Sequence, residues 1–390
     1  IISNFLFSQN YIGYQISQNN DLMKSIENND IESVKNILRD GNNLDIYNNK
    51  YGMSSLMYAA KLGNMEIVKE LLDFGAKDFD FAFYMACMEG YWDIAQKFIN
   101  EGANNFDIAL TYAAIGGQLD IVKELINLGA KDINGALVSA CEGNHLEIVK
   151  YFIENGANVN TKAYIEPYRY YEGAERKYPI TAATNIDIIK ELVNAGATNL
   201  NEALIYNAKQ TNRTDNIFNL LEFGADINSH NYGNEKTILM YLIERENPDI
   251  EAIKKIIELG ADINATDRNG NNILIRAVLF EYDKEDNGIY RVFSTPLKIM
   301  EELLKAGANM TQRNIYGNTA YRIAARNKKK ELMEAAKKAE EEYQNFKNDI
   351  CKKGKEAVEY IDKHNLKGIV LAGRPYHSDP EINHGIDTLI

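Results

Sequence analysis

The segment Asp120-Ile121-Val122-Lys123-Glu124-Leu125-Ile126-Asn127-Leu128-Gly129-Ala130 decides the fold of this chain. Its apolar residues recur at i, i+1, i+4 and i+5, which places them on one face of a helix, and the glycine ends the helix in a left-handed conformation. Similar helical patterns end in Gly-Ala pairs eight times, at Gly75-Ala76, Gly102-Ala103, Gly129-Ala130, Gly156-Ala157, Gly196-Ala197, Gly224-Ala225, Gly260-Ala261 and Gly307-Ala308. Self-similarity of this kind is the signature of a solenoid, in which neighbouring units bury each other's apolar faces.

A second, shorter helix is expected earlier in each unit, where small residues gather as in Leu56-Met57-Tyr58-Ala59-Ala60. Alanine pairs allow such a helix to pack closely against its neighbours. We therefore predict an all-α solenoid of about ten helix-turn-helix units over residues 20–325, with residues 1–19 as a lead-in.

Two segments carry a family resemblance: Tyr51-Gly52-Met53-Ser54-Ser55-Leu56-Met57-Tyr58-Ala59-Ala60 and Asp267-Arg268-Asn269-Gly270-Asn271-Asn272-Ile273-Leu274. They resemble the ankyrin repeat, although its Thr-Pro-Leu-His signature is eroded. The resemblance implies helix pairs joined by short β-hairpins, here called fingers. It also implies a non-enzymatic scaffold or adaptor that binds a protein partner through finger tips, first helices and inserted loops.

The spacing of the units varies along the array. From Gly75 to Gly156 successive glycines are 27 residues apart, against roughly 33 in a full ankyrin unit, so we expect trimmed fingers there. Fingers are expected around Tyr51, Tyr232, Asn269 and Tyr316, with glycine in each tight turn. Two longer steps predict insertions at residues 161–178 and 281–294.

The first insertion is the candidate binding element, because tyrosine and arginine dominate protein-binding hot spots. Its candidate residues are Tyr164, Tyr168, Arg169, Tyr170, Tyr171, Arg176 and Tyr178. The alternative is that this loop packs on its own solenoid and covers an irregular unit.

Composition limits the remaining functions. The formal net charge is −13, which argues against nucleic-acid binding and favours a protein partner with a basic surface. No apolar run is long enough for a membrane span. We expect no catalytic, cofactor-binding or metal-binding residues, no cofactor, a monomeric state and an intracellular location. His145 is expected to hydrogen-bond an interhelical loop, and Cys87 and Cys141 are expected to fill the core.

After Arg326 the sequence changes to a charged helical junction over residues 326–345 and an incomplete α/β segment over 346–390. The stretch Gly368-Ile369-Val370-Leu371-Ala372-Gly373-Arg374-Pro375-Tyr376-His377 resembles proteins related to the activase of 2-hydroxyacyl-CoA dehydratases, and the resemblance covers about residues 331–390. Arg374, His377 and His384 belong to a loop that would meet a ligand, but a lone strand cannot assemble that site. Both chain ends look cut. Either the chain continues past Ile390, or two unrelated coding segments have been joined.

Overall fold

A computed structural model describes residues 21–40, 53–165, 176–210, 213–245, 247–279 and 297–326, together with residues 348, 351–353, 355, 356, 359 and 363. The chain divides into two compact units, unit 1 at Ile1–Ala203 and unit 2 at Leu204–Ile390, and each is described by itself.

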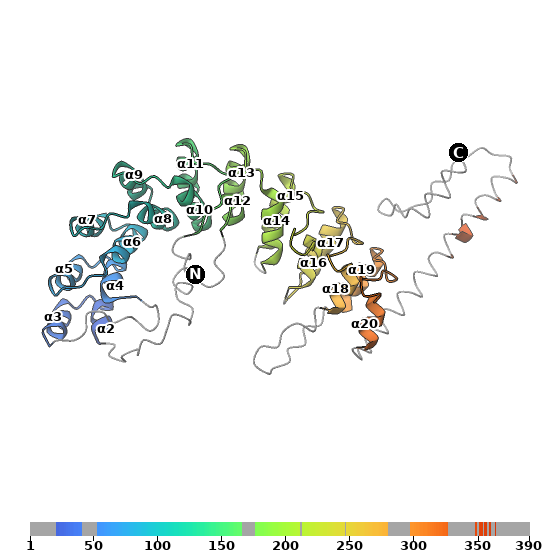
Figure 1. Cartoon of the computed structure of the whole chain (residues 1–390), viewed down its shortest axis with the longest axis horizontal. Helices are drawn as coiled ribbons and strands as arrows, with labels where there is room; N and C mark the ends of the chain where they lie inside the picture. Colours follow the sequence, from blue (N-terminus) through green and yellow to red (C-terminus); the bar gives the residue numbers. More distant parts are fainter. Residues whose placement is uncertain are drawn as a thin grey trace. The chain divides into compact units, whose positions relative to one another are not determined.

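Unit 1 consists of helices that alternate between first and second positions of a repeat, and successive pairs stack side by side (Figure 1). Its helices are α2 (Asp21–Glu27), α3 (Ile31–Arg39), α4 (Ser55–Lys61), α5 (Met65–Asp73), α6 (Phe79–Glu89), α7 (Trp92–Asn100), α8 (Phe106–Gly116), α9 (Leu119–Asn127), α10 (Ile133–Gly143), α11 (Leu146–Glu154), α12 (Pro179–Ala182) and α13 (Ile186–Asn194). The boundary between the units falls within α14 (Leu200–Lys209).

Unit 2 continues the alternation of first and second helices. Its helices after α14 are α15 (Thr214–Glu222), α16 (Ile238–Ile243), α17 (Ile250–Glu258), α18 (Ile273–Leu279), α19 (Leu297–Lys305) and α20 (Ala320–Arg326). Among the described residues there is no strand, only two isolated antiparallel bridges, Ala163–Lys177 and His230–Thr237. The predicted all-α solenoid of helix pairs is therefore confirmed.

The two kinds of helix bury different amounts of their surface. The second helix α9 is amphipathic and buries Ile121, Val122 and Leu125, whereas the first helix α8 buries every residue from Ala109 to Ile115. First helices lie between the first helices of the adjacent units and against their own second helix, so they are apolar on nearly all sides. Close packing also needs small residues, since a Cβ at Gly116 would lie only 1.9 Å from the carbonyl oxygen of Met88.

Trimmed fingers are present in unit 1, as the 27-residue spacing predicts. After Gly102, which has φ of +111°, α8 begins only four residues later at Phe106. The next short connection, between Gly129 and Ile133, is held by a side chain of α8, because Asp107 Oδ1 accepts hydrogen bonds from the backbone N–H groups of Lys131 and Asp132. The first helix α8 therefore helps to hold the turn that leads into the following repeat.

Within unit 1, side chains at the starts of second helices link each repeat to the repeat before it. Each reaches a backbone carbonyl near the end of the preceding first helix: Asn64 Nδ2 donates to Ile26 at 3.1 Å, Gln118 Nε2 donates to Met88 at 3.2 Å, and His145 Nε2 lies 3.0 Å from the carbonyl oxygen of Ile115. These contacts satisfy carbonyls that have no partner within their own helix.

Candidate protein-binding surfaces

The tyrosine-rich insertion begins and ends in a short antiparallel stem. The backbone N–H of Ala163 donates to the carbonyl oxygen of Lys177 at 3.0 Å, and the N–H of Lys177 donates back to Ala163 at 2.8 Å. Ile165, which follows the first side of the stem, is buried with 4% of its surface exposed. The insertion therefore leaves and rejoins the array at one fixed place.

Charged side chains fasten this stem to helices on both sides of it. Lys177 Nζ lies 3.2 Å from Glu142 Oε2 on α10, and Lys162 Nζ lies 2.6 Å from Glu202 Oε1 on α14. The ammonium of Lys162 also lies 4.9 Å from the centre of the Tyr178 ring, a cation–π contact. Arg176 donates from its guanidinium to the carbonyl oxygen of Lys162.

The predicted site residues separate into two groups. Tyr164 is 38% exposed, Arg176 is exposed, and Tyr178 is half-buried under Lys162. The other four, Tyr168, Arg169, Tyr170 and Tyr171, lie outside the described residues, as does the second insertion at 281–294. The described members thus form the stem, and Arg176 and Tyr178 have structural contacts within it.

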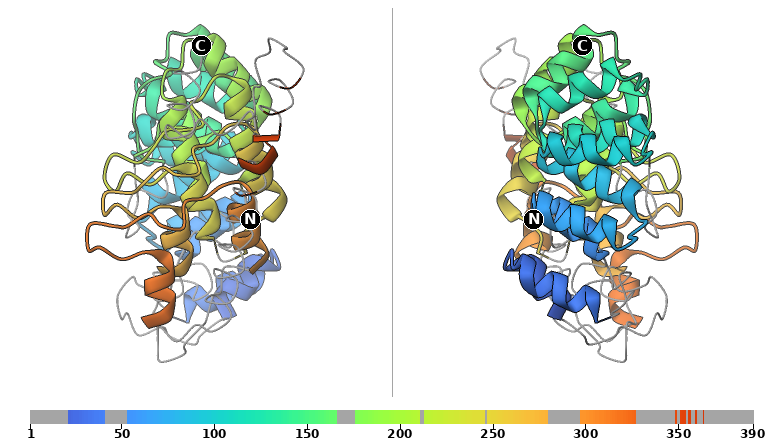
Figure 2. Two further views of the ribbon diagram at one scale, coloured as in Figure 1. Left: turned by 90° about the vertical axis from the view of Figure 1, so that its right-hand side faces the viewer. Right: turned by 90° about the vertical axis from the view of Figure 1, so that its left-hand side faces the viewer.

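Three fingers of unit 2 are joined by backbone hydrogen bonds into one continuous edge, which we call the finger ridge. It comprises residues 230–237, 267–272 and 314–319. The N–H of Arg268 donates to the carbonyl oxygen of Asn234 at 3.0 Å, and the N–H of Ile315 donates to that of Asn269 at 3.0 Å. In Figure 2 the loops that contain these fingers, coloured yellow to orange, project to one side of the helices of unit 2.

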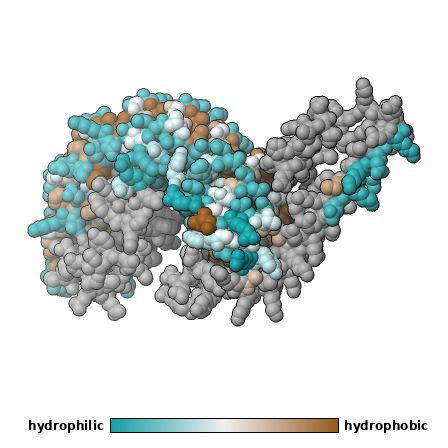
Figure 3. Space-filling view, turned by 45° about the vertical axis from the view of Figure 1, so that its right-hand side comes forward, coloured by the Kyte–Doolittle hydropathy of each residue, from teal (hydrophilic) through white to brown (hydrophobic). Residues whose placement is uncertain are grey.

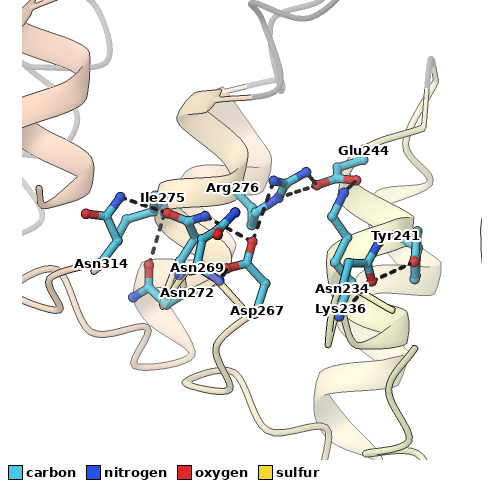
Figure 4. Close-up of polar contacts among 11 residues, drawn as sticks. Asn234, Lys236, Tyr241, Glu244, Asp267, Asn269, Asn272, Ile275, Arg276 and Asn314 are labelled. Atoms are coloured by element: carbon cyan, nitrogen blue, oxygen red, sulfur yellow. Dashed lines mark hydrogen bonds and ion pairs between the residues drawn. The ribbon is translucent and has the colours of Figure 1, made fainter. Parts of the chain in front are cut away.

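A buried polar network between the fingers and the adjacent first helices holds the fingers in place (Figure 4). Asp267, which is 4% exposed, accepts hydrogen bonds from the N–H groups of Asn269 and Asn271, both at 2.9 Å. The guanidinium of Arg276 lies 3.6 Å from Asp267 and also pairs with Glu244. Lys236 Nζ is 2.7 Å from the same Glu244 carboxylate. The network connects the backbone of the finger at 267–272, and Lys236 of the preceding finger, to Arg276 on α18 and to Glu244 at the end of α16.

One finger departs from the expected turn chemistry. Gly270 and Gly317 occupy left-handed positions with φ of +70° and +71°, as predicted, but in the finger around Tyr232 the left-handed residue is Glu235, with φ of +59°. Gly233 is not in that region. This finger has one more residue between its bridge partners, since Asn231 N–H bonds Lys236 O whereas Asp267 N–H bonds Asn271 O. Gly233 lies in this turn, as predicted, but the left-handed position falls on Glu235.

The outer tips of the finger ridge expose large apolar side chains. Tyr232 is 91% exposed, Ile315 is 66% exposed and Tyr316 is 71% exposed. On the face shown in Figure 3 the described surface is mostly hydrophilic, with small hydrophobic spots between the polar residues. Sequence reasoning placed fingers at Tyr232 and Tyr316 but did not propose their side chains as binding residues, because a single exposed aromatic at a rim was expected to contribute little. These exposed side chains could have been identified from the sequence, because each lies close to the turn glycine of its finger.

Residues that could carry chemistry have structural roles in the described part of the chain. His145 bonds a backbone carbonyl, as expected, though that carbonyl belongs to the preceding first helix. Cys87 and Cys141 are fully buried, and burial raises the pKa of both thiols. The described ranges contain no group of three or more His, Cys, Asp or Glu side chains that could hold a metal ion. Arg374, His377 and His384 lie outside them.

No helix within the described ranges has both the length and the apolar character needed to cross a membrane.

Paired helices, left-handed glycine stops and hydrogen-bonded fingers define a helical repeat protein. The family profile of ankyrin repeats (3 copies) matches residues 22–106 and 83–163, so this part of the chain is similar to ankyrin repeats. The profile described as the CoA enzyme activase uncharacterised domain matches residues 248–390. Both predicted resemblances are confirmed. No curated protein matches the chain.

The activase-related match begins well before residue 331, where the resemblance was expected to start. Its first part covers α17, α18, α19 and α20. In the structure these helices, with the fingers at 267–272 and 314–319, continue the solenoid of unit 2. The family match and the repeat architecture therefore overlap over residues 248–326.

Proposed function

We propose that the chain is a non-enzymatic scaffold or adaptor whose ankyrin array binds a protein partner through finger tips, first helices and the tyrosine-rich insertion. The observation that carries this proposal is the anchored stem of the insertion. Two backbone hydrogen bonds and two ion pairs hold its ends at one place on the array. Anchoring lowers the conformational entropy lost when an inserted loop binds, which favours recognition over a passive connection.

The same proposal includes the character of the partner. The first-helix segments of unit 1, residues 53–61, 77–89, 104–116 and 131–143, hold three basic and six acidic residues. That negative face fits a partner with a basic surface and disfavours nucleic acid. A monomer suffices for this function, since each surface belongs to one chain.

The experiment compares capture of a partner by the intact chain and by a triple variant, Tyr168→Ala, Tyr170→Ala and Tyr171→Ala. We expect the variant to capture its partner at least about tenfold more weakly, with an unchanged melting temperature, because hot-spot tyrosines contribute affinity and not folding stability. Phe74→Ala with Leu128→Ala is the matched control, since both residues are exposed and lie away from the stem. Unchanged capture by the triple variant, or an equal loss in the control, would refute the role of the insertion.

A second candidate function is a regulatory ankyrin array fused to an activase-like enzyme. The observation that favours it is the match to the CoA enzyme activase domain over residues 248–390. Sequencing a transcript across residues 325–343 and onward past Ile390 separates the two. A reading frame that continues into further strands and cysteines supports the enzyme, and a break in the transcript supports two joined segments.

A further inference from the structure

We infer that the finger ridge of unit 2 recognises an acidic, extended segment of a partner protein, with Arg268 and Arg313 as the charged contacts and Tyr232, Ile315 and Tyr316 as the apolar ones. This inference rests on the proposed function and names the chemistry of one of its surfaces.

The first argument is the distribution of charge within unit 2. The finger and first-helix segments, residues 229–245, 266–279 and 309–325, hold six basic and three acidic residues. The second-helix segments, residues 213–228, 247–265 and 297–308, hold five basic and nine acidic residues. The finger side of unit 2 is thus positive, in a chain whose net charge is −13. It is also opposite in sign to the first-helix face of unit 1.

The second argument is which of these charges remain available at the surface. Lys236 and Arg276 pair with Glu244, and Arg245 is 5% exposed, with its guanidinium donating to the carbonyl oxygens of Ala208 and Asn207. Arg268, on the ridge, and Arg313, which immediately precedes the third finger, are different. The side chain of Arg268 is 60% exposed and its Nε lies 3.8 Å from Glu235 Oε1, and Arg313 is exposed.

The third argument is that these two arginines are held in position before any partner binds. Arg268 donates one N–H to the carbonyl oxygen of Tyr232 at 3.0 Å, and Arg313 donates one to the carbonyl oxygen of Gly317 at 3.2 Å. Each guanidinium has five N–H groups, so a braced arginine keeps donors for a carboxylate. A planar guanidinium binds a carboxylate through two parallel hydrogen bonds, which is why fixed arginines favour acidic partners.

The fourth argument is the spacing of apolar and charged tips along a rigid edge. Arg268 lies on the finger between those of Tyr232 and Tyr316, and backbone hydrogen bonds join all three fingers. Exposed tyrosines on a fixed backbone lose little conformational entropy on binding. An extended segment that alternates acidic and apolar side chains matches this order of contacts.

The test presents a library of random 12-residue peptides to the immobilised full chain and, in parallel, to the double variant Arg268→Glu, Arg313→Glu. We expect the peptides that bind the chain and not the variant to contain more Asp and Glu than Lys and Arg, with at least one aromatic or aliphatic residue. The best of them then serves as the probe in fluorescence polarisation. Tyr232→Ser with Tyr316→Ser, and Arg268→Glu alone, should each raise its Kd by more than tenfold.

Two control variants come from the same unit, Lys254→Glu and Leu259→Ser, and both residues are exposed or partly exposed on or beside α17. They should leave the Kd unchanged. The inference is overturned if the selected peptides are neutral or basic, if the controls weaken binding equally, or if no peptide distinguishes the chain from the double variant. Deleting residues 165–177 should not affect peptide binding. If ridge variants leave peptide binding unchanged while the insertion still captures a partner, this inference is refuted and the proposed function of the insertion is not.

Discussion

His145 Nε2 lies 3.0 Å from the carbonyl oxygen of Ile115, although 30 residues separate them in the chain. His145 begins a second helix, and Ile115 lies in the last turn of the first helix of the preceding unit. One side chain therefore links two repeats. It does so by satisfying a backbone carbonyl that the helix itself leaves without a partner.

The His145 contact predicts a measurable coupling between repeats. His145→Ala should lower the free energy of unfolding by about 1–2 kcal/mol, because the Ile115 carbonyl would lose its bond. His145→Gln should lower the free energy of unfolding much less, since Gln118 makes the equivalent hydrogen bond to the Met88 carbonyl one repeat earlier. Urea unfolding followed by circular dichroism measures both. Equal losses in the alanine and glutamine variants would show that the hydrogen bond is not what stabilises this position.

Glu235 predicts a stabilising substitution. A non-glycine residue in the left-handed region is disfavoured by about 1–2 kcal/mol. Glu235→Gly removes that cost and loses only a surface ion pair with Arg268, so the free energy of unfolding should rise by about 0.5–1 kcal/mol. Gly317→Ala is the matched control, because φ is +71° there and nothing lies within 4 Å of the added Cβ. It should destabilise by about 1 kcal/mol. A destabilised Glu235→Gly variant would mean that the side chain outweighs the backbone strain.

Substitution of Asp267 is expected to lower the free energy of unfolding by a large amount. Its buried carboxylate accepts three hydrogen bonds, one from Asn269 and two from the buried Asn271, and faces Arg276. Asp267→Ala should destabilise unit 2 by about 3–5 kcal/mol, because it leaves the buried Asn271 donors without their acceptor and removes one of the two carboxylates that pair with Arg276. Asp267→Asn keeps an acceptor oxygen and the volume of the side chain, so it should destabilise unit 2 less than Asp267→Ala does. Thermal unfolding measures both, and a loss below about 1 kcal/mol in the alanine variant would contradict the role of this network.

The positions of the three cysteines lead to two predictions, one on thiol modification and one on how the free energy of unfolding depends on pH. Cys87 and Cys141 are buried, which raises the pKa of their thiols, and Cys351 is exposed. A thiol reagent such as DTNB should therefore modify one cysteine rapidly in the native chain and three in urea. Cys351→Ser should abolish the rapid reaction. Rapid modification of two or more thiols in the native chain would contradict the buried positions.

The sign of the pH effect follows from the raised pKa. Unfolded thiols ionise near pH 8.5, whereas the buried thiols stay protonated. The two cysteines thus contribute stability that is fully present below about pH 8.5 and is lost as the pH rises above it.

Repetition made most of the fold predictable. Each Gly-Ala pair marks the end of a second helix, and the 27-residue spacing correctly indicates trimmed fingers, because few residues remain between Gly102 and Phe106. These are local properties of the chain. Helix periodicity and left-handed stops depend on residues a few positions apart, which a single sequence displays directly.

The finger ridge was only partly predictable. An additional residue moves the left-handed position from Gly233 to Glu235, and no local rule selects glutamate there. The hydrogen bonds from Arg268 to Asn234 and from Ile315 to Asn269 join residues 34 and 46 positions apart, so they emerge only when the units stack. The arginines braced against finger carbonyls, which carry the inference about acidic partners, could not be distinguished from other surface charges in the sequence.

The most direct test of the protein-binding account is hydrogen exchange of the full chain with and without a captured partner. The account predicts that bound partner slows exchange in residues 161–178, in the finger ridge or in both, and leaves the second helices α5, α7 and α9 unchanged. Protection confined to those second helices or to residues 331–390 would contradict it.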